Sequence, residues 1–243
     1  MAFLSAPWPN LTSVGTLSTT REGGVSKPPF NSLNLGLHVD DDPEHVLKNR
    51  ALVEQSLPSP PLWLNQVHSA NVLCVDADFN FQTLHSADAL YTKVKNQPLA
   101  IMSADCLPIL FASHDGHEVA AVHGGWRGLE KGIIKNTLAC FCAPSNQIYA
   151  WLGPAIGAEQ FEVGAEVATR FIAKSPLFKE AFKLQSNNKY LCDIYLIARI
   201  ELEQLGVINI SGGDYCTVSQ PSLFFSYRRE GKTGRMATLI WRK

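Results

Sequence analysis

Short β-branched and apolar segments, each bounded by glycine, proline or polar residues, recur along most of the chain and constrain its fold more than any other feature. Segments of about four to eight such residues are typical of β-strands. We expect strands at residues 14–19, 62–65, 72–75, 87–91, 99–102, 109–112, 119–123, 148–152 and 237–241. So many strands predict a protein built around β-sheets.

Helical periodicity appears in fewer places: residues 43–54, 129–141, 163–172 and 193–205, the last followed by Gly206 as a stop signal. Strands and helices do not alternate regularly, so their order favours an α+β fold with mixed sheets over a doubly wound parallel sheet. Of the 243 residues, 46% are hydrophobic and 18% are charged, which is enough for a sizeable core. We expect a single domain over residues 1–243.

The charge balance excludes several classes of partner. The 21 basic and 22 acidic residues give a formal net charge of −1, and no basic run is longer than a pair such as Arg228–Arg229. This predicts no nucleic-acid partner, because phosphate backbones are bound by clustered Lys and Arg side chains.

No apolar run reaches the roughly 18 residues of a membrane span, and the N-terminal segment lacks the basic start of a secretory signal. We therefore expect no membrane association and a cytoplasmic location.

Most cysteines and histidines lie in sequence segments that suggest no catalytic or metal-binding role. The six cysteines include no CxxC pair and are expected to be reduced thiols. Packing is the expected role of five of them: Cys74, Cys140, Cys142, Cys192 and Cys216. Five of the seven histidines are interpreted as surface or loop residues: His38, His45, His85, His114 and His117.

The remaining cysteine and histidines lie in three motifs that combine them with glycine, proline or a strand end. The motifs are NQVH at residues 65–68, ADCLP at 104–108 and AVHGGWRG at 121–128. We expect all three as loop tips at one rim of the molecule. Pro108 should prevent a regular central strand, so Cys106 is expected at a break in the chain that a ligand can reach.

The glycines after His123 favour an anion site. Without a Cβ atom at Gly124 or Gly125, backbone amides can approach a ligand closely, and a helix starting near residue 129 would point its N-terminal dipole at the same loop. Arg127 adds a positive charge. A lone histidine is more often structural and a lone cysteine more often inert. The hypothesis of a functional site therefore depends on the three motifs occurring together with these glycines and Arg127.

Two further segments offer arginines. STTREGGVS, at residues 18–26, places Arg21 in a glycine-rich turn, where its guanidinium could hold an oxyanion; a surface arginine in a flexible loop is an equal alternative. SYRR and TGR near the C-terminus are expected to form a charged hairpin tip between two strands, with the lesser alternative that one arginine faces the site.

With these motifs, the chain resembles the YfiH-like family, also called the laccase-domain or polyphenol oxidase family. The resemblance covers nearly the whole chain and includes FNSLNLGLHVDDDP, WLGPAIG, FEVG, GGDYCT and FFSYRREGKTGRMA. It implies a layered α/β/β/α domain in which His68, Cys106 and His123 form the metal-binding and catalytic triad, generally with zinc. Gly124 stands where many relatives are expected to carry alanine, a change that should be neutral for metal binding.

The activities implied by the resemblance concern small molecules. They are phosphorolysis of adenosine, inosine and methylthioadenosine, deamination of adenosine, and copper-dependent oxidation of polyphenols; some members are linked to quality control of peptidoglycan precursors. The implied partners are a nucleoside and phosphate, and the chain is expected to be a monomer or a small homo-oligomer.

Physical arguments separate these activities. Two neutral imidazoles and one thiolate leave Zn²⁺ with a net positive charge and an open position, as in catalytic zinc sites. Such a site lowers the pKa of a bound water to about 7, which suits deamination at C6 of adenine. Phosphorolysis instead needs a phosphate held in line with C1′, for which Arg21 and the amides of Gly124 and Gly125 are candidates.

Three alternatives use the same residues. A copper laccase needs roughly ten histidines besides one cysteine, whereas this chain has seven histidines and no HxH pair, so copper oxidation would be a weak activity of one His₂Cys site. A cysteine hydrolase, for example one that edits peptidoglycan precursors, would use Cys106 as nucleophile and His68 or His123 as base. A non-enzymatic binding module would close the zinc site with a fourth protein ligand.

Overall fold

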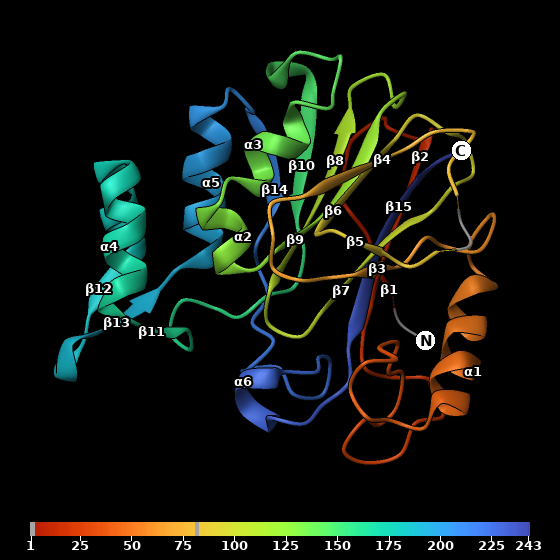
Figure 1. The fold of residues 1–243 in the computed structure, drawn as a ribbon, viewed down its shortest axis with the longest axis horizontal. Coiled ribbons are helices and arrows are strands. Elements are labelled where there is room, and N and C mark those ends of the chain that lie inside the picture. Colours follow the sequence, from red (N-terminus) through yellow and green to blue (C-terminus); the bar gives the residue numbers. More distant parts are fainter. Residues whose placement is uncertain (1–2, 81–82) are drawn as a thin grey trace.

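A four-stranded and a six-stranded β-sheet pack against each other at the centre of the molecule (Figure 1). This computed structural model describes residues 3–80 and 83–243. The four-stranded sheet is antiparallel throughout, in the order β1 (Phe3–Leu4), β2 (Val14–Thr19), β15 (Met236–Arg242) and β7 (Leu99–Ser103). Pairing of β2 with β15 joins the two ends of the chain.

The six-stranded sheet is mixed. Its order is β14 (Asn209–Gly212), β10 (Ile148–Leu152), β8 (Leu107–Ser113), β9 (Val119–Gly124), β6 (Ala89–Thr92) and β4 (Val72–Val75). The outermost pairs, β14–β10 and β6–β4, are parallel, and the inner pairs are antiparallel. Every residue of β8 and β9 is buried, which explains why their sequences are continuous apolar runs rather than alternating ones.

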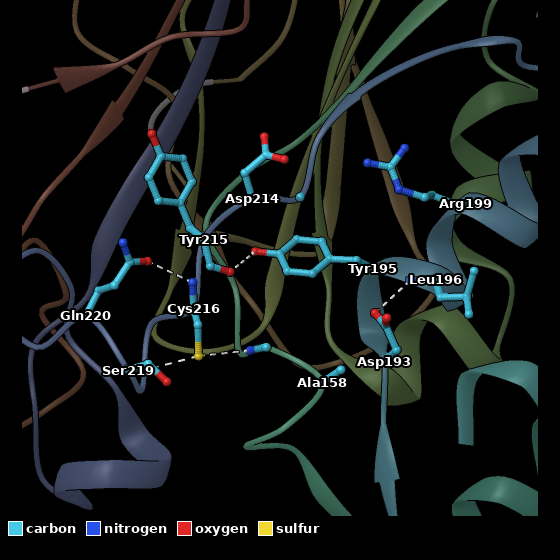
Figure 2. Close-up of a pocket in the computed structure, with 12 residues that line it drawn as sticks. Ala158, Asp193, Tyr195, Leu196, Arg199, Asp214, Tyr215, Cys216, Ser219 and Gln220 are labelled. Atoms are coloured by element: carbon cyan, nitrogen blue, oxygen red, sulfur yellow. Dashed lines mark hydrogen bonds between the residues drawn. The ribbon is translucent and has the colours of Figure 1, made fainter. Parts of the chain in front are cut away.

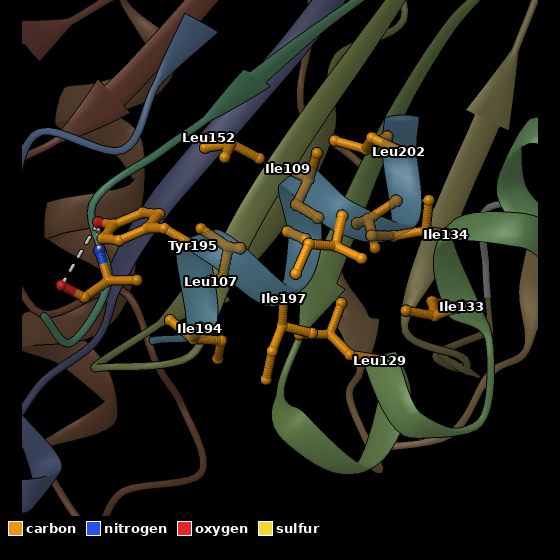
Figure 3. Packing of buried hydrophobic residues seen from close by; sticks show 14 of the residues in the cluster. Leu107, Ile109, Leu129, Ile133, Ile134, Leu152, Ile194, Tyr195, Ile197 and Leu202 are labelled. Carbon is orange, nitrogen blue, oxygen red and sulfur yellow. Dashed lines mark hydrogen bonds between the residues drawn. The ribbon is translucent and has the colours of Figure 1, made fainter. Parts of the chain in front are cut away.

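Helices cover the outer faces of both sheets. On the four-stranded sheet, Val53 of α1 (Pro43–Glu54) packs with Leu239 and its neighbours. The opposite face of the six-stranded sheet is covered by α2 (Trp126–Glu130), α3 (Ile133–Leu138) and α5 (Ile194–Gln204). Helix α4 (Ala165–Lys174) lies beyond α5, farther from this sheet (Figure 1). Figure 3 shows this packing, with side chains of α2, α3 and α5 against Ile109 and Leu152. The α/β/β/α layering with mixed sheets confirms the expected fold class.

Smaller elements complete the structure. A three-stranded sheet beside α4 contains β11 (Glu162–Gly164), β13 (Lys189–Cys192) and β12 (Phe182–Leu184). A two-stranded ladder pairs β3 (Leu64–Asn65) with β5 (His85–Ser86). Three 3₁₀ turns, at Ser145–Gln147, Pro176–Ala181 and Ser186–Asn188, and the short helix α6 (Tyr227–Glu230) lie in connections. No helix in the described ranges is long and apolar enough to cross a membrane.

Local signals explain the helix ends that the sequence predicts well. The side chain of Asp42 accepts a hydrogen bond from the amide of Glu44 at 2.9 Å, and Pro43 occupies the first position of α1. Asp193 caps α5 in the same way through the amide of Leu196. Gly206, with φ of 83°, follows α5 as expected. Accordingly, α1 has the expected bounds and α5 differs by one residue at each end.

Three expectations near the site are wrong. The helix expected over residues 129–141 is two helices, α2 and α3, separated by Gly132 with φ of 87°. Pro108 does not prevent a central strand, because it is the second residue of β8 and pairing with β10 stops at Ile109, so no neighbouring strand needs an N–H from Pro108. The charged C-terminal segment is the helix α6 rather than a hairpin tip, since the preceding strand β14 ends far earlier, at Gly212.

Candidate metal and active site

His68, Cys106 and His123 come together at one end of the six-stranded sheet. His68 lies in the loop after β3, Cys106 in the short loop between β7 and β8, and His123 near the end of β9. Their candidate ligand atoms all lie within 4.8 Å of one another. The Sγ atom of Cys106 is 3.8 Å from Nε2 of His68, and the two imidazole rings meet edge to face with centroids 4.8 Å apart.

Strand register explains why residues so far apart in sequence meet. In the antiparallel β8–β9 pair, Pro108 lies opposite His123, so the loop that carries Cys106 ends beside the imidazole. On the other side of β9, the amide of His123 donates to the carbonyl of Asp88 at 2.7 Å. Asp88 directly precedes β6 and is fully buried.

Asp88 holds two of the three candidate ligands in place. Its Oδ1 lies 2.8 Å from Nδ1 of His123 and accepts the amide of His68 at 3.0 Å. Its Oδ2 accepts the amide and the hydroxyl of Ser69 at 2.6 and 2.7 Å. Because Asp88 engages Nδ1 of His123, Nε2 is the atom left free for a metal, an arrangement common around metal-binding histidines.

Two further contacts fix the loops. The side-chain amide of Gln66 bonds both the carbonyl and the amide of Met102, at 2.7 and 2.8 Å, which ties the His68 loop to β7. Asp105 has φ of 95° and accepts bonds from the hydroxyl of Thr217 and the amide of Arg228, both at 2.6 Å. The NQVH and ADCLP motifs therefore contain the residues that position their own candidate ligands, His68 and Cys106.

A side chain at either of the two glycines after His123 would crowd the site. A Cβ atom on Gly125 would lie 2.8 Å from Cδ2 of His68 and 3.3 Å from Sγ of Cys106. Gly124 is buried in β9, where a Cβ atom would lie 2.8 Å from the carbonyl oxygen of Leu107. The two glycines thus permit close packing around the three candidate ligands, and an anion-binding role for their amides stays a prediction.

The ionisation states of the site are coupled. Burial opposes ionisation of Cys106, but His123 and His68 outweigh it and lower the pKa of the thiol to about 6. Burial also opposes protonation of His123, yet Cys106 and Asp88 raise the pKa of this imidazole to about 9. Hydrogen bonds from His123 and Ser69 overcome burial and hold the pKa of Asp88 at about 2. The metal-free pair is therefore a thiolate beside an imidazolium, and the thiolate is the form that binds metals.

A cavity of about 310 Å³ opens onto the three candidate ligands. Its walls include His38, Tyr227 and Arg235, none of which lies in the three motifs. Burial lowers the pKa of His38, and the charges of Arg235, Arg50 and His123 lower it further, which favours the neutral imidazole. The expectation that His38 is merely a surface residue is therefore incomplete, because it is exposed yet lines the cavity.

Arg235 fits the lesser expectation that a C-terminal arginine faces the site. Its Nη1 donates to the carbonyls of Thr233 and Gly234, each at 3.0 Å. In the described part of the chain, the guanidinium has no further hydrogen bond and no carboxylate partner, so donors remain for an anion in the cavity.

The structure does not bring Arg21 or Arg127 to this cavity. The guanidinium of Arg21 forms an ion pair with Glu230 at 2.8 Å, donates to the carbonyls of Asn31 and Pro221, and lies over the ring of Phe225. Arg127 is exposed on α2, with its guanidinium 4.5 Å from the ring centroid of Trp126. Substrate or phosphate binding by either arginine stays a prediction.

The fold and the site together define a layered α/β protein with a three-residue, metal-competent centre. The family model described as multi-copper polyphenol oxidoreductase laccase matches residues 15–243. The purine nucleoside phosphorylase YfiH of Shigella flexneri is 49% identical over 236 residues, covering 96% of both chains, and its Escherichia coli K12 counterpart is 48% identical with the same coverage. A solved Neisseria meningitidis structure of the DUF152 family superposes with a TM-score of 0.95 at 45% identity, covering 99% of both chains.

The chain therefore belongs to the laccase-domain family that its motifs indicate. Relatives at this identity are named as purine nucleoside phosphorylases, which supports an enzyme that acts on small molecules.

Proposed function

We propose that this chain is a zinc-dependent purine nucleoside phosphorylase acting on adenosine, inosine and methylthioadenosine, with adenosine deamination as a second reaction. The observation that carries the proposal is the placement of His68, Cys106 and His123, with ligand atoms within 4.8 Å, on a cavity that Arg235 also lines. The cavity volume of about 310 Å³ suits a small molecule. The names of the relatives support the reaction class.

The donor set fits a catalytic metal. Two imidazole nitrogens and one thiolate leave a fourth tetrahedral position open, and no fourth candidate ligand joins this cluster among the described residues. This geometry disfavours the closed zinc site of a non-enzymatic binding module. Bound Zn²⁺ would supply Lewis-acid chemistry to a substrate atom beside it.

The chain's own residues have separate roles in this proposal. Arg235 holds the phosphate dianion, because it lines the cavity, its guanidinium has donors without a hydrogen-bond partner among the described residues, and its charge complements the ligand. His38, kept neutral by burial and nearby arginines, donates or accepts one hydrogen bond without adding charge. The exposed ring of Tyr227, beside Arg235, offers a stacking surface for a purine.

A second candidate, a cysteine hydrolase, is favoured by one observation. The thiol of Cys106, with its pKa lowered to about 6 by His123 and His68, together with the His123–Asp88 hydrogen bond of 2.8 Å, resembles a nucleophile–base–carboxylate arrangement. That chemistry needs no metal. Activity of the metal-free protein therefore separates the two candidates.

Copper-dependent oxidation of polyphenols is the weaker alternative. In residues 3–80 and 83–243, only the cluster of His68, Cys106 and His123 brings three or more candidate ligands together. A multi-copper oxidase requires additional histidine-rich copper sites for electron transfer to oxygen. We infer that any copper oxidation by this cluster is slow compared with phosphorolysis.

The test is product analysis with protein of known metal content. Inosine, adenosine and methylthioadenosine are incubated with the protein in the presence and absence of phosphate, and bases, sugars and sugar phosphates are separated by chromatography. The proposal expects free base plus ribose 1-phosphate from inosine only with phosphate, and inosine from adenosine without it. Products that do not depend on phosphate, together with phenol oxidation that scales with added copper, would overturn it.

A further inference from the structure

Two cysteines that the proposed reaction does not use lie side by side on the surface. Cys74 belongs to the edge strand β4, and Cys140 follows the C-terminal end of α3. Their Sγ atoms are 3.6 Å apart, and the thiol of Cys140 also lies 3.5 Å from the carbonyl oxygen of Asn136. Cys74 is exposed and Cys140 is half-buried, so small oxidants in solution can reach the pair.

The other cysteines have different surroundings. Cys106, whose thiol has a lowered pKa, belongs to the candidate metal site. Cys192 is fully buried, and burial raises its pKa, which disfavours oxidation. Cys216 lies in a separate pocket, where the amides of Gly157 and Ser219 donate to its sulfur (Figure 2). Cys142 lies 3.0 Å from the ammonium group of Lys93. Among the described residues, Cys74 and Cys140 are the only cysteines with a thiol–thiol contact.

We propose that Cys74 and Cys140 are a redox-sensitive pair that forms a reversible disulfide when the protein meets hydrogen peroxide. A disulfide needs its sulfurs about 2.05 Å apart, so they must approach by roughly 1.5 Å. Rotation of one or both side chains about the Cα–Cβ bond would supply this approach. Neither thiol holds a charged partner in the described structure that this rotation would break.

The reaction takes two balanced steps. The thiolate of Cys74 attacks one peroxide oxygen, the O–O bond breaks, hydroxide leaves, and Cys74 becomes a sulfenic acid. The sulfur of Cys140 then attacks the sulfur of Cys74, the S–O bond breaks, and the departing hydroxide takes the thiol proton as water. In total, two thiols and one peroxide give one disulfide and two waters. Burial and the contact with Cys74 raise the pKa of Cys140 to about 11, which assigns the first step to the exposed Cys74.

The bond would join two elements that continue into the candidate metal site. β4 follows the loop that carries His68, and α2 and α3 follow Gly125. These elements already meet through the side chain of Asn136, which donates to the carbonyl of Ala70 at 2.8 Å. Since the disulfide spans 66 positions of sequence, it should raise the melting temperature by several degrees.

Limiting peroxide tests the proposal on the whole protein. The reduced protein is treated with hydrogen peroxide, its thiols are counted in denaturant, and non-reduced digests are mapped by mass spectrometry. Besides any oxidation of the low-pKa thiol of Cys106, wild type should lose two of its six thiols, yield a peptide that links Cys74 to Cys140, and melt at a higher temperature. Dithiothreitol should reverse all three changes. Cys74→Ser and Cys140→Ser should each abolish the linked peptide, whereas the matched control Cys142→Ser should retain it.

Three outcomes would overturn the disulfide proposal. Cys74 found as a sulfinic acid while Cys140 stays a free thiol, or Cys74 linked to Cys142, would overturn the proposal. Equal thiol loss in wild type and Cys74→Ser would do the same. The map of the wild-type protein gives an answer even where a variant is unstable. Because activity is not the readout, this result is independent of the proposed phosphorylase.

Discussion

Asp88 and His123 share a hydrogen bond of 2.8 Å between a buried carboxylate and Nδ1 of the imidazole. The same carboxylate oxygen accepts the amide of His68 at 3.0 Å. One buried carboxylate therefore orients one candidate ligand through its ring and another through its backbone. The geometry of the candidate metal site depends on Asp88 even though Asp88 is not one of the three clustered candidate ligands.

Replacement of this carboxylate should weaken the metal site. Asp88→Asn should lower zinc affinity by about 10- to 100-fold, because His123 loses its charged partner. Chelator competition measures the affinity, and Ser69→Ala is a matched control that removes only one hydrogen bond to Asp88. If the folded variant keeps wild-type affinity while its melting temperature falls, Asp88 stabilises the fold and not the site.

Zinc binding should release protons in a pH-dependent way. The pKa of Cys106 is lowered to about 6 and that of His123 is raised to about 9, so the metal-free site is a thiolate–imidazolium pair between these values. Since metal displaces the proton of His123, binding near pH 7.5 should release about one proton, and affinity should fall steeply below pH 6, where Cys106 is protonated. Calorimetry in buffers of different ionisation enthalpy counts the protons. No release at pH 7.5 would contradict this assignment.

Arg235 should affect phosphate binding and leave zinc binding unchanged. Arg235→Gln should raise KM for phosphate at least about tenfold, because a charge-assisted contact to the dianion is lost. Zinc content should stay unchanged. Initial rates at varied phosphate measure the effect, with Arg127→Gln as a matched control on an exposed arginine outside the cavity. A normal KM for phosphate would remove Arg235 from the substrate site.

Arg21 should matter for stability. Its ion pair with Glu230 is largely buried, with side chains 12% and 24% exposed, so Arg21→Ala should cost about 1–3 kcal/mol of unfolding free energy. Urea denaturation measures the loss. Hydrogen bonds from Thr233, Arg21 and Arg229 overcome burial and hold the pKa of Glu230 at about 2, below its ordinary value of 4.5. This stabilisation is therefore present above pH 4.5 and is lost as the pH falls toward 2.

Unchanged stability of Arg21→Ala, combined with a large rise in KM for phosphate, would instead support the anion-binding role that the glycine-rich turn suggests. Arg127→Ala serves as the comparison for stability, since substitution of this exposed side chain should change the free energy of unfolding by less than about 0.5 kcal/mol.

The sequence predicts the elements and the three candidate ligands better than it predicts their surroundings. Strands β2, β4 and β10 and helix α1 have the expected bounds, because their apolar patterns and caps are local. The sequence predicts one helix where α2 and α3 are two. The break at Gly132 depends on a left-handed conformation that an otherwise helical pattern does not reveal. The sequence does not show that Pro108 is tolerated in β8, because this depends on where pairing with β10 ends.

The remaining site residues depend on long-range pairing. Asp88 meets His123 only through the register of β6 and β9, and Arg235 reaches the cavity from the segment before β15. No local pattern gives that register. One signal was available: Asp88 is an acidic residue between two alanines at the start of a buried strand, where an unpaired carboxylate would be costly. Arg21 has a contact that the sequence does not predict, because a glycine-rich turn does not reveal an ion-pair partner as distant in sequence as Glu230.

The most direct test of the central claim measures zinc content and inosine phosphorolysis on the same samples. Metal-free protein is titrated with Zn²⁺, and ribose 1-phosphate formation is followed beside elemental analysis, for wild type and Cys106→Ala. The account predicts that the rate rises in proportion to bound zinc up to about one per chain, and that Cys106→Ala neither retains zinc nor turns over inosine. Full activity of the metal-free protein, or stoichiometric zinc in Cys106→Ala, would contradict it.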